Sequence, residues 1–111
     1  MKTAVPFVLA LVVAFAVITA MRNTPAPTPG VFAAEAELNG ALSASAESGK
    51  PVLAYFTADW CGPCQQFKRD TLANDRVAGV IDEKTIPVYI DIDENGTAAS
   101  QYRVQGVPTT L

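Results

Sequence analysis

The sequence predicts an α/β domain, one sheet between layers of helices, behind a separate apolar N-terminal segment. Short apolar runs at residues 52–56 and 86–92 predict strands, and segments with helical spacing lie around and between them. An apolar run without alternation, as at 52–56, is typical of a strand covered on both faces. We therefore expect the order helix, strand, helix, strand, helix, strand over residues 35–111, the pattern of a sheet flanked by helices.

The N-terminal segment stands apart from this domain. Residues 4–21 contain no charged side chain and lie between Lys2 and Arg22. A helix of this length rises ~27 Å at ~1.5 Å per residue, close to the ~30 Å hydrocarbon core of a bilayer. We expect residues 1–22 to be an uncleaved signal anchor or a cleaved signal peptide, although a signal-peptide core is usually only ~7–15 residues long. A buried globular helix is the third alternative, and the first two place the remaining chain outside the cytoplasm.

A proline-rich linker is expected at residues 23–34. Pro25, Pro27 and Pro29 alternate with other residues, which favours polyproline II at ~3.1 Å per residue. Within it we expect residues 23–30 to be extended and without packing, which would make a ~25 Å spacer between a membrane and the domain. An ordinary disordered leader is the alternative.

The first helix and strand of the domain follow the linker. The helix is expected at residues 35–47, where Leu38, Ala41 and Leu42 recur at helical spacing. Gly40 weakens this pattern because glycine disfavours a helix interior. The strand at 52–56 comes next and leads into a loop.

A second helix begins around Cys61, since Pro63 is tolerated in a first helical turn. Asn74 is expected to cap a further helical turn over residues 76–81. The remaining elements are a strand at 86–92, a turn at 93–96, a short helix at 97–102 and a third strand led by Thr109.

Composition and charge exclude several classes of function. The chain has no histidine, which removes His-based catalytic triads and most zinc or copper sites. Its formal net charge is −3, and all acidic side chains follow residue 30. Because phosphate contacts need clustered Lys and Arg, we expect no nucleic-acid partner.

The chemistry is concentrated in the motif Trp60-Cys61-Gly62-Pro63-Cys64. Residues at i and i+3 of a helix lie on one face with Cβ atoms ~5–6 Å apart, so a modest adjustment allows a disulfide. Cys61 lies at the helix start, where free N–H groups stabilise a thiolate and lower the pKa below the free value of ~8.5. Cys64 lies one turn further on and should be less exposed. The motif favours thiol–disulfide exchange, with Cys61 attacking first.

Three other interpretations of the cysteine pair stay open. A purely structural disulfide would close a very short loop and remove little unfolded-state entropy. A metal site needs about four ligands, which one Cys pair without His supplies poorly. The pair could also be reduced and idle.

The stretch TADWCGPC after an apolar strand, with Gly106-Val107-Pro108-Thr109 further along, resembles the thioredoxin family. Residues 50–111 are similar in particular to the C-terminal domain of membrane thiol–disulfide interchange reductases and to related exported proteins. The resemblance implies a thioredoxin-like fold with a central mixed sheet flanked by helices. It also implies no cofactor beyond a redox-active Cys61–Cys64 disulfide.

The resemblance assigns roles to individual residues. Cys61 would be the attacking cysteine and Cys64 the resolving one. Pro108 would follow a cis peptide bond, and the alternative is a trans proline at the start of an edge strand. Trp60 would flank the exchange site, and the alternative is that it packs in the core. The residues implied to contact the substrate are Trp60, Gly62, Pro63, Val107 and Pro108.

The implied function is reduction of protein disulfides on the periplasmic side of a bacterial inner membrane. Gly62-Pro63 is the dipeptide found in reducing thioredoxins, and a membrane or soluble electron donor would regenerate the dithiol. The N-terminal helix would attach the protein to the membrane. The alternative is a redox-inactive module that holds client proteins in the groove beside Pro108.

Several positions depart from the family pattern. Tyr55 stands where thioredoxins carry a buried acid, Tyr89 replaces a frequent lysine, and Asp59 is expected to be solvated. The proton acceptor for Cys64 is therefore not identified. The family also has a hairpin strand and a helix after the cis-proline strand, so we expect a chain that stops at Leu111 to be truncated.

Overall fold

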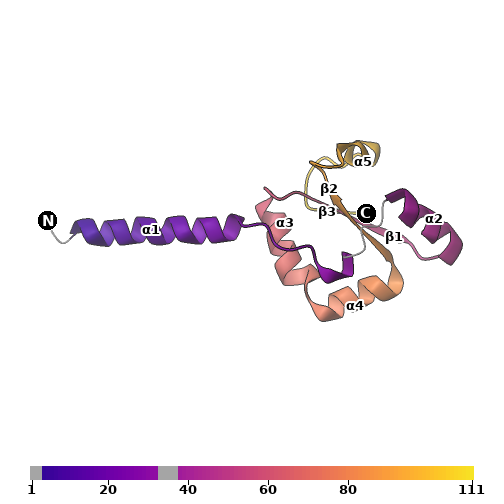
Figure 1. The fold of residues 1–111 in the computed structure, drawn as a ribbon, viewed down its shortest axis with the longest axis horizontal. Coiled ribbons are helices and arrows are strands. Elements are labelled where there is room, and N and C mark those ends of the chain that lie inside the picture. The colour runs from indigo at the N-terminus through magenta and orange to yellow at the C-terminus, as the bar shows by residue number, and fades with distance from the viewer. Residues whose placement is uncertain (1–3, 33–37) are drawn as a thin grey trace.

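The computed structural model describes residues 4–32 and 38–111 (Figure 1). An N-terminal helix leads into a small α/β domain. The elements are α1 (Ala4–Asn23), the 3-10 turn η1 (Gly30–Phe32), α2 (Leu38–Ser48), β1 (Val52–Thr57), α3 (Gly62–Phe67), the π-helical turn η2 (Lys68–Leu72), α4 (Asp75–Lys84), β2 (Ile86–Asp91), α5 (Gly96–Gln101) and β3 (Thr109–Thr110).

The described strands form one mixed sheet in the order β2-β1-β3. β1 and β2 are parallel, in a register that runs from Val52 opposite Ile86 to Thr57 opposite Asp91. A parallel pair needs a crossover connection, and α3, η2 and α4 supply it. β3 pairs antiparallel with β1 through two residue pairs. The predicted α/β class with a mixed sheet is confirmed.

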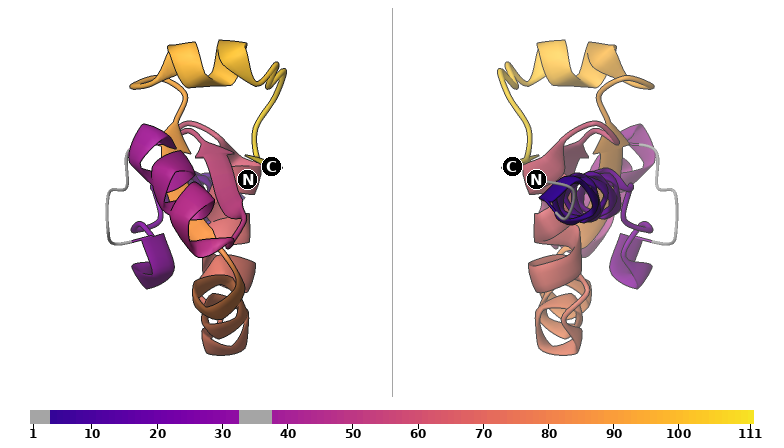
Figure 2. Two further views of the ribbon diagram at one scale, coloured as in Figure 1. Left: turned by 90° about the vertical axis from the view of Figure 1, so that its right-hand side faces the viewer. Right: turned by 90° about the vertical axis from the view of Figure 1, so that its left-hand side faces the viewer.

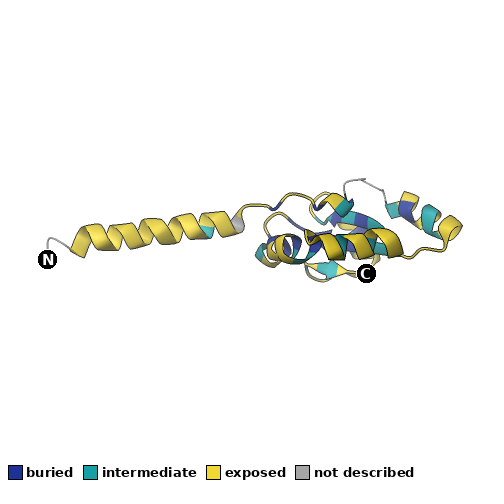
Figure 3. Cartoon of the chain, turned by 90° about the horizontal axis from the view of Figure 1, so that it is seen from below, coloured by how far each residue is buried: buried dark blue, intermediate teal, exposed yellow. Residues whose placement is uncertain are grey.

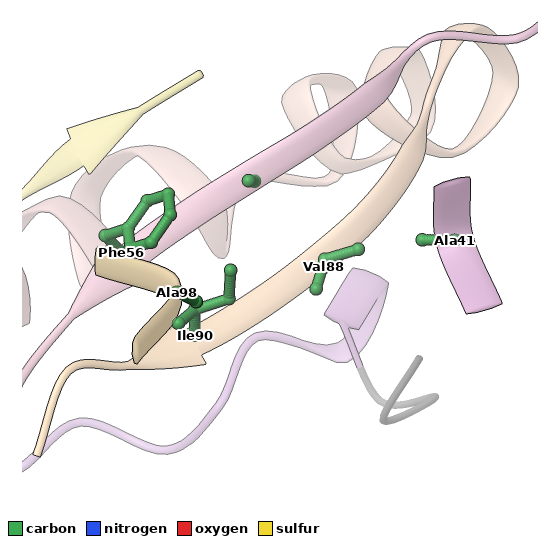
Figure 4. Close-up of a cluster of buried hydrophobic side chains, with 6 residues drawn as sticks. Ala41, Phe56, Val88, Ile90 and Ala98 are labelled. Atoms are coloured by element: carbon green, nitrogen blue, oxygen red, sulfur yellow. The ribbon is translucent and has the colours of Figure 1, made fainter. Parts of the chain in front are cut away.

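Helices cover both faces of the sheet, with α5 and α4 on opposite sides of it (Figure 2). One core cluster joins Phe56, Val88 and Ile90 of the strands to Ala41 of α2 and Ala98 of α5 (Figure 4). The other face of β1 buries Tyr55 with Leu72, Phe67 and Tyr89 packed around it. The apolar run of β1 is thus covered on both faces, as its lack of alternation predicted.

The predicted elements are present with shifted ends. The helix expected from residue 35 begins at Leu38, and residues 35–37 lie outside the described part of the chain. Asn74 caps α4 by accepting hydrogen bonds from the N–H groups of Arg76 and Val77, as expected. The π-helical turn after Phe67 was not predicted, because its residues have the same helical spacing as the helix before it.

The prediction that residues 23–30 are extended and without packing is wrong at Ala26 and Pro29. Ala26, Pro29 and Phe32 are buried, and η1 closes with a hydrogen bond from Phe32 N–H to Pro29 C=O. The Phe32 ring packs 5.9 Å from the ring of Tyr55, measured between centroids. Burial of the Phe32 ring contributes about 1.5–3 kcal/mol, and the hydrogen bonds of Ala26 with Gln65 and Lys68 add to it. Residues 33 and 34 lie outside the described part.

Helix α1 projects from the domain, and its side chains over residues 4–22 are exposed apart from the half-buried Thr19 (Figure 3). The molecule measures 72 × 31 × 17 Å along its principal axes, and α1 lies along the longest of them (Figure 1). None of the apolar span Ala4–Arg22 is buried, which contradicts the alternative of a buried globular helix. The span is long and apolar enough to cross a membrane, and a signal sequence has the same properties.

Candidate functional site: a cysteine pair at the start of α3

Cys61 and Cys64 form a disulfide, with their Cα atoms 5.2 Å apart. Cys61 is 4% exposed and Cys64 is fully buried, in agreement with the prediction that Cys64 is the less accessible sulfur. With Ala58 they form a small buried cluster against which Ile92 and Val107 pack. A reagent that approaches from solvent therefore meets Cys61 first.

Local structure places Cys61 at the N-cap of α3. β1 ends at Thr57, a loop follows, and the backbone of Cys61 is still extended where the helix begins. Pro63 sits in the first turn, where its missing N–H costs nothing. The N–H of Cys64 donates to the Cys61 sulfur over 3.2 Å. In the reduced protein this donor would stabilise a Cys61 thiolate directly.

The loop before β3 brings a second, distant segment to the cysteines. The Val107–Pro108 peptide bond is cis, as the family resemblance implied. The carbonyl oxygen of Val107 lies 3.6 Å from the Cys61 sulfur. A hollow of about 440 Å³ is lined by residues 102–109 and Leu111, so the outer side of this loop is open.

The remaining predicted site residues, Trp60, Gly62 and Pro63, adjoin the cysteines in sequence and do not line this hollow. Trp60 is 68% exposed, which contradicts the alternative that it packs in the core. Its ring N–H donates to a carboxylate oxygen of Asp93 over 2.8 Å. Pro63 is exposed and Gly62 is half-buried. The structure therefore places the Val107 carbonyl beside Cys61, with Trp60 and Pro63 exposed next to the cysteine pair.

Tyr55 lies directly beneath the cysteine pair. Its hydroxyl donates to the carbonyl oxygen of Cys64 over 3.2 Å. Burial raises the pKa of the Tyr55 phenol above its ordinary value of 10.0. A side-chain interaction with Thr57 lowers this pKa in part, and electrostatic repulsion from Tyr89 raises it further. The group is therefore a neutral hydrogen-bond donor near pH 7 and not a proton acceptor. Asp59 is exposed in the loop, as expected.

The sequence did not single out two buried polar residues on α3 and η2. Gln65 is fully buried, and its amide NH₂ donates to the carbonyls of Ala58 and Asp59, over 2.9 and 3.3 Å. Lys68 is 2% exposed, and its ammonium lies 5.2 Å from the ring centroid of Tyr89. Gln65 lies four residues after Cys61 and Lys68 four residues before Leu72, so helical spacing places both on the buried face of the helix. This spacing could have predicted their burial from the sequence.

The described residues contain no cluster of side chains that could bind a metal ion. No group of three or more His, Cys, Asp or Glu residues in 4–32 and 38–111 lies close enough to hold a metal ion. The site offers instead a pair of sulfurs, backbone donors and an open loop edge. This arrangement suits sulfur exchange with an extended peptide segment.

Comparisons with known proteins agree with the fold and the motif. A family model described as thioredoxin-like matches residues 33–111. Thioredoxin 1 of Synechococcus elongatus is 37% identical over 65 residues, which cover 59% of this chain and 58% of that protein. A thioredoxin of Streptomyces clavuligerus is 40% identical over 63 residues, covering 57% and 55%. The chain thus spans less than two thirds of the length of these relatives.

Solved structures show the same fold. A thioredoxin from Thermus thermophilus superposes with a TM-score of 0.59 at 28% identity, covering 66% of this chain and 58% of that one. A DsbH oxidoreductase superposes with a TM-score of 0.61 at 22% identity, covering 76% and 69%. From the family model, the sheet order and the cysteine motif together, the chain belongs to the thioredoxin-like family.

Proposed function

We propose that this protein is a thiol–disulfide oxidoreductase that reduces protein disulfides through Cys61 and Cys64. The observation that carries the proposal is the disulfide at the start of α3, in which the more accessible sulfur accepts the N–H of Cys64. That donor favours the ionised form of Cys61, and the thiolate is the reactive species. The family membership supports the same chemistry.

Each sulfur has one step in the proposed reaction. The Cys61 thiolate attacks one sulfur of a substrate disulfide, forms a mixed disulfide and releases the other substrate sulfur as a thiolate. Cys64 then loses its proton and attacks the Cys61 sulfur, which releases the second substrate sulfur. The two released thiolates take up one proton from Cys64 and one from water. The substrate gains two electrons, and the Cys61–Cys64 disulfide forms.

The Val107 backbone is proposed to align the substrate during these steps. Its carbonyl is 3.6 Å from the Cys61 sulfur, and the loop edge beyond it is open. An extended peptide beside this edge would add its backbone hydrogen bonds to those of the loop. Trp60, Gly62 and Pro63 would flank the bound segment.

We further propose that the domain works outside the cytoplasm, on the periplasmic side of a membrane that α1 spans. Helix α1 is apolar and exposed, and its last turn carries the basic residue Arg22. An oxidising compartment would convert the dithiol to the disulfide, so an electron donor, membrane-bound or soluble, must reduce it again.

The activity is tested by reduction of insulin in the presence of dithiothreitol, followed by turbidity. We expect the full chain to accelerate precipitation and Cys61→Ser to abolish the acceleration. Ser100→Ala, on an exposed position of α5, is the matched control and should behave like the unaltered chain. Equal rates for Cys61→Ser and the unaltered chain would favour the redox-inactive client-binding module instead.

The order of attack has its own test. Cys64→Ala removes the resolving sulfur, so mixed disulfides with substrate should accumulate on non-reducing gels. Cys61→Ala should show none. Mixed disulfides that form through Cys64 in the Cys61→Ala variant would reverse the assigned roles.

A further inference from the structure

The linker is held against the helix that carries the cysteines. The chain between α1 and η1 runs beside α3 (Figure 1), and Ala26 is buried there. The N–H of Ala26 donates to the side-chain oxygen of Gln65 over 2.7 Å, and the Ala26 carbonyl accepts from the Lys68 ammonium over 3.5 Å. Both backbone polar groups of this one linker residue therefore have partners on α3 and η2.

The Gln65 side chain uses both ends of its amide. Its NH₂ group donates to the carbonyls of Ala58 and Asp59, in the loop between β1 and α3, over 2.9 and 3.3 Å. The partner of the amide oxygen is an N–H and the partners of the NH₂ group are carbonyls, so only this orientation of the amide satisfies all three bonds. Because Gln65 is fully buried, bulk solvent does not compete for them.

The backbone of Cys61 is bonded to this arrangement on both sides. The N–H of Cys61 donates over 3.2 Å to the Ala58 carbonyl, the same oxygen that accepts from the Gln65 side chain. The Cys61 carbonyl accepts the backbone N–H of Gln65, also over 3.2 Å. A chain of three hydrogen bonds thus runs from the linker at Ala26 through Gln65 and Ala58 to the cysteine that is proposed to attack the substrate.

The position of the Cys61 backbone matters for the chemistry of its sulfur. Cys61 stands at the N-cap of α3 with an extended backbone, at φ −82° and ψ 103°, and in this position its sulfur accepts the N–H of Cys64. The stabilisation of an anion at a helix start falls off within the first turn, so a shift of the Cys61 backbone weakens it. The contacts that fix this backbone therefore also set the reactivity of the sulfur.

We propose that Gln65 is a positioning residue that ties Cys61 to the docked linker, so that Cys61 has its full reactivity only while the linker lies against the domain. The inference rests on the proposed function. Gln65 acts on Cys61 through the Ala58 carbonyl. When the linker detaches, the Gln65 oxygen loses its donor, and a buried amide in that state turns to regain a partner, away from the loop carbonyls.

The test is the pH midpoint of Cys61 alkylation in the reduced full chain in detergent, with mass spectrometry to separate the products of Cys61 and Cys64. Gln65→Leu removes the amide and keeps a similar volume. We expect it to raise the midpoint by about half a pH unit, which leaves ~3-fold less thiolate at a pH below the midpoint. Gln66→Leu, on the exposed neighbour, is the matched control and should leave the midpoint unchanged.

A second variant tests the linker's part in the coupling. Ala26→Pro removes the N–H that Gln65 accepts and leaves the donors of Gln65 in place, in a stretch where alternate residues are already proline. We expect a rise of the midpoint here too. Thr28→Pro, at an exposed linker position, is its matched control. Adding Ala26→Pro to Gln65→Leu should raise the midpoint no further than Gln65→Leu alone, because the linker acts through Gln65.

A variant destabilised elsewhere separates positioning from a purely structural role. Val88→Ala removes buried methyl groups from the core cluster around Phe56 and should lower stability without moving the midpoint. The inference is overturned if Gln65→Leu leaves the midpoint unchanged, if Val88→Ala raises it equally, or if Ala26→Pro has no effect or adds in full to Gln65→Leu. If Gln65→Leu does not fold, Ala26→Pro alone decides. Insulin reduction by the unaltered chain tests the proposed function separately.

Discussion

The two faces of strand β1 are both buried, yet their chemistry differs. Phe56 and its neighbours pack against small apolar residues of α2 and α5 and make no polar contact with the site. The opposite face carries Tyr55, whose hydroxyl donates to the Cys64 carbonyl, and the buried Thr57. Both faces bury apolar side chains, and the second adds the hydrogen bond that ties β1 to the helix carrying the cysteines.

The largest effect on stability is expected from the apolar face. Phe56 is fully buried, so Phe56→Ala should lower the free energy of unfolding by about 3–5 kcal/mol. Denaturant unfolding of the oxidised protein measures this. Leu42→Ala, at a 43% exposed position of α2, is the control and should cost much less. Similar losses for the two variants would mean that the apolar face does not carry the stability.

A smaller effect is expected where the polar face meets the linker. Gln65→Leu keeps a similar volume but leaves the buried Ala26 N–H without its partner, whereas the Ala58 carbonyl still accepts the N–H of Cys61. Each buried group left unpaired costs about 1–3 kcal/mol. Gln66→Leu, on the exposed neighbour, is the matched control in the same unfolding experiment. If both leucine variants unfold alike, the linker is not held by Gln65.

The smallest effect is expected at Tyr55. Tyr55→Phe removes only the hydroxyl that donates to the Cys64 carbonyl, at a cost of about 0.5–1.5 kcal/mol. Because burial raises the pKa of this phenol in the folded protein, its contribution is complete below pH ~10 and is lost as pH rises through the folded value. Unfolding measured from pH 8 to 11 should therefore show a steeper fall for the unaltered chain than for Tyr55→Phe. Parallel curves would contradict the assigned burial.

Local sequence patterns predicted much of the fold and of the candidate site. The unalternated run of β1 predicted a strand covered on both faces, and the spacing of Cys61 and Cys64 predicted a disulfide at a helix start. The packing of the linker could not be predicted in this way. Ala26 and Gln65 are 39 residues apart in sequence, and neither has a local signal that names the other. Prolines that favour an extended conformation also permit one that packs on a surface.

The functional account depends most on the acidity of one thiol. In the reduced protein, the rate of alkylation of Cys61 can be followed against pH, with mass spectrometry to separate its product from that of Cys64. The account predicts a pKa for Cys61 below the value of ~8.5 for a free cysteine, because the N–H of Cys64 donates to that sulfur. A Cys61 pKa at or above the free value, or a Cys64 that reacts first, would contradict it.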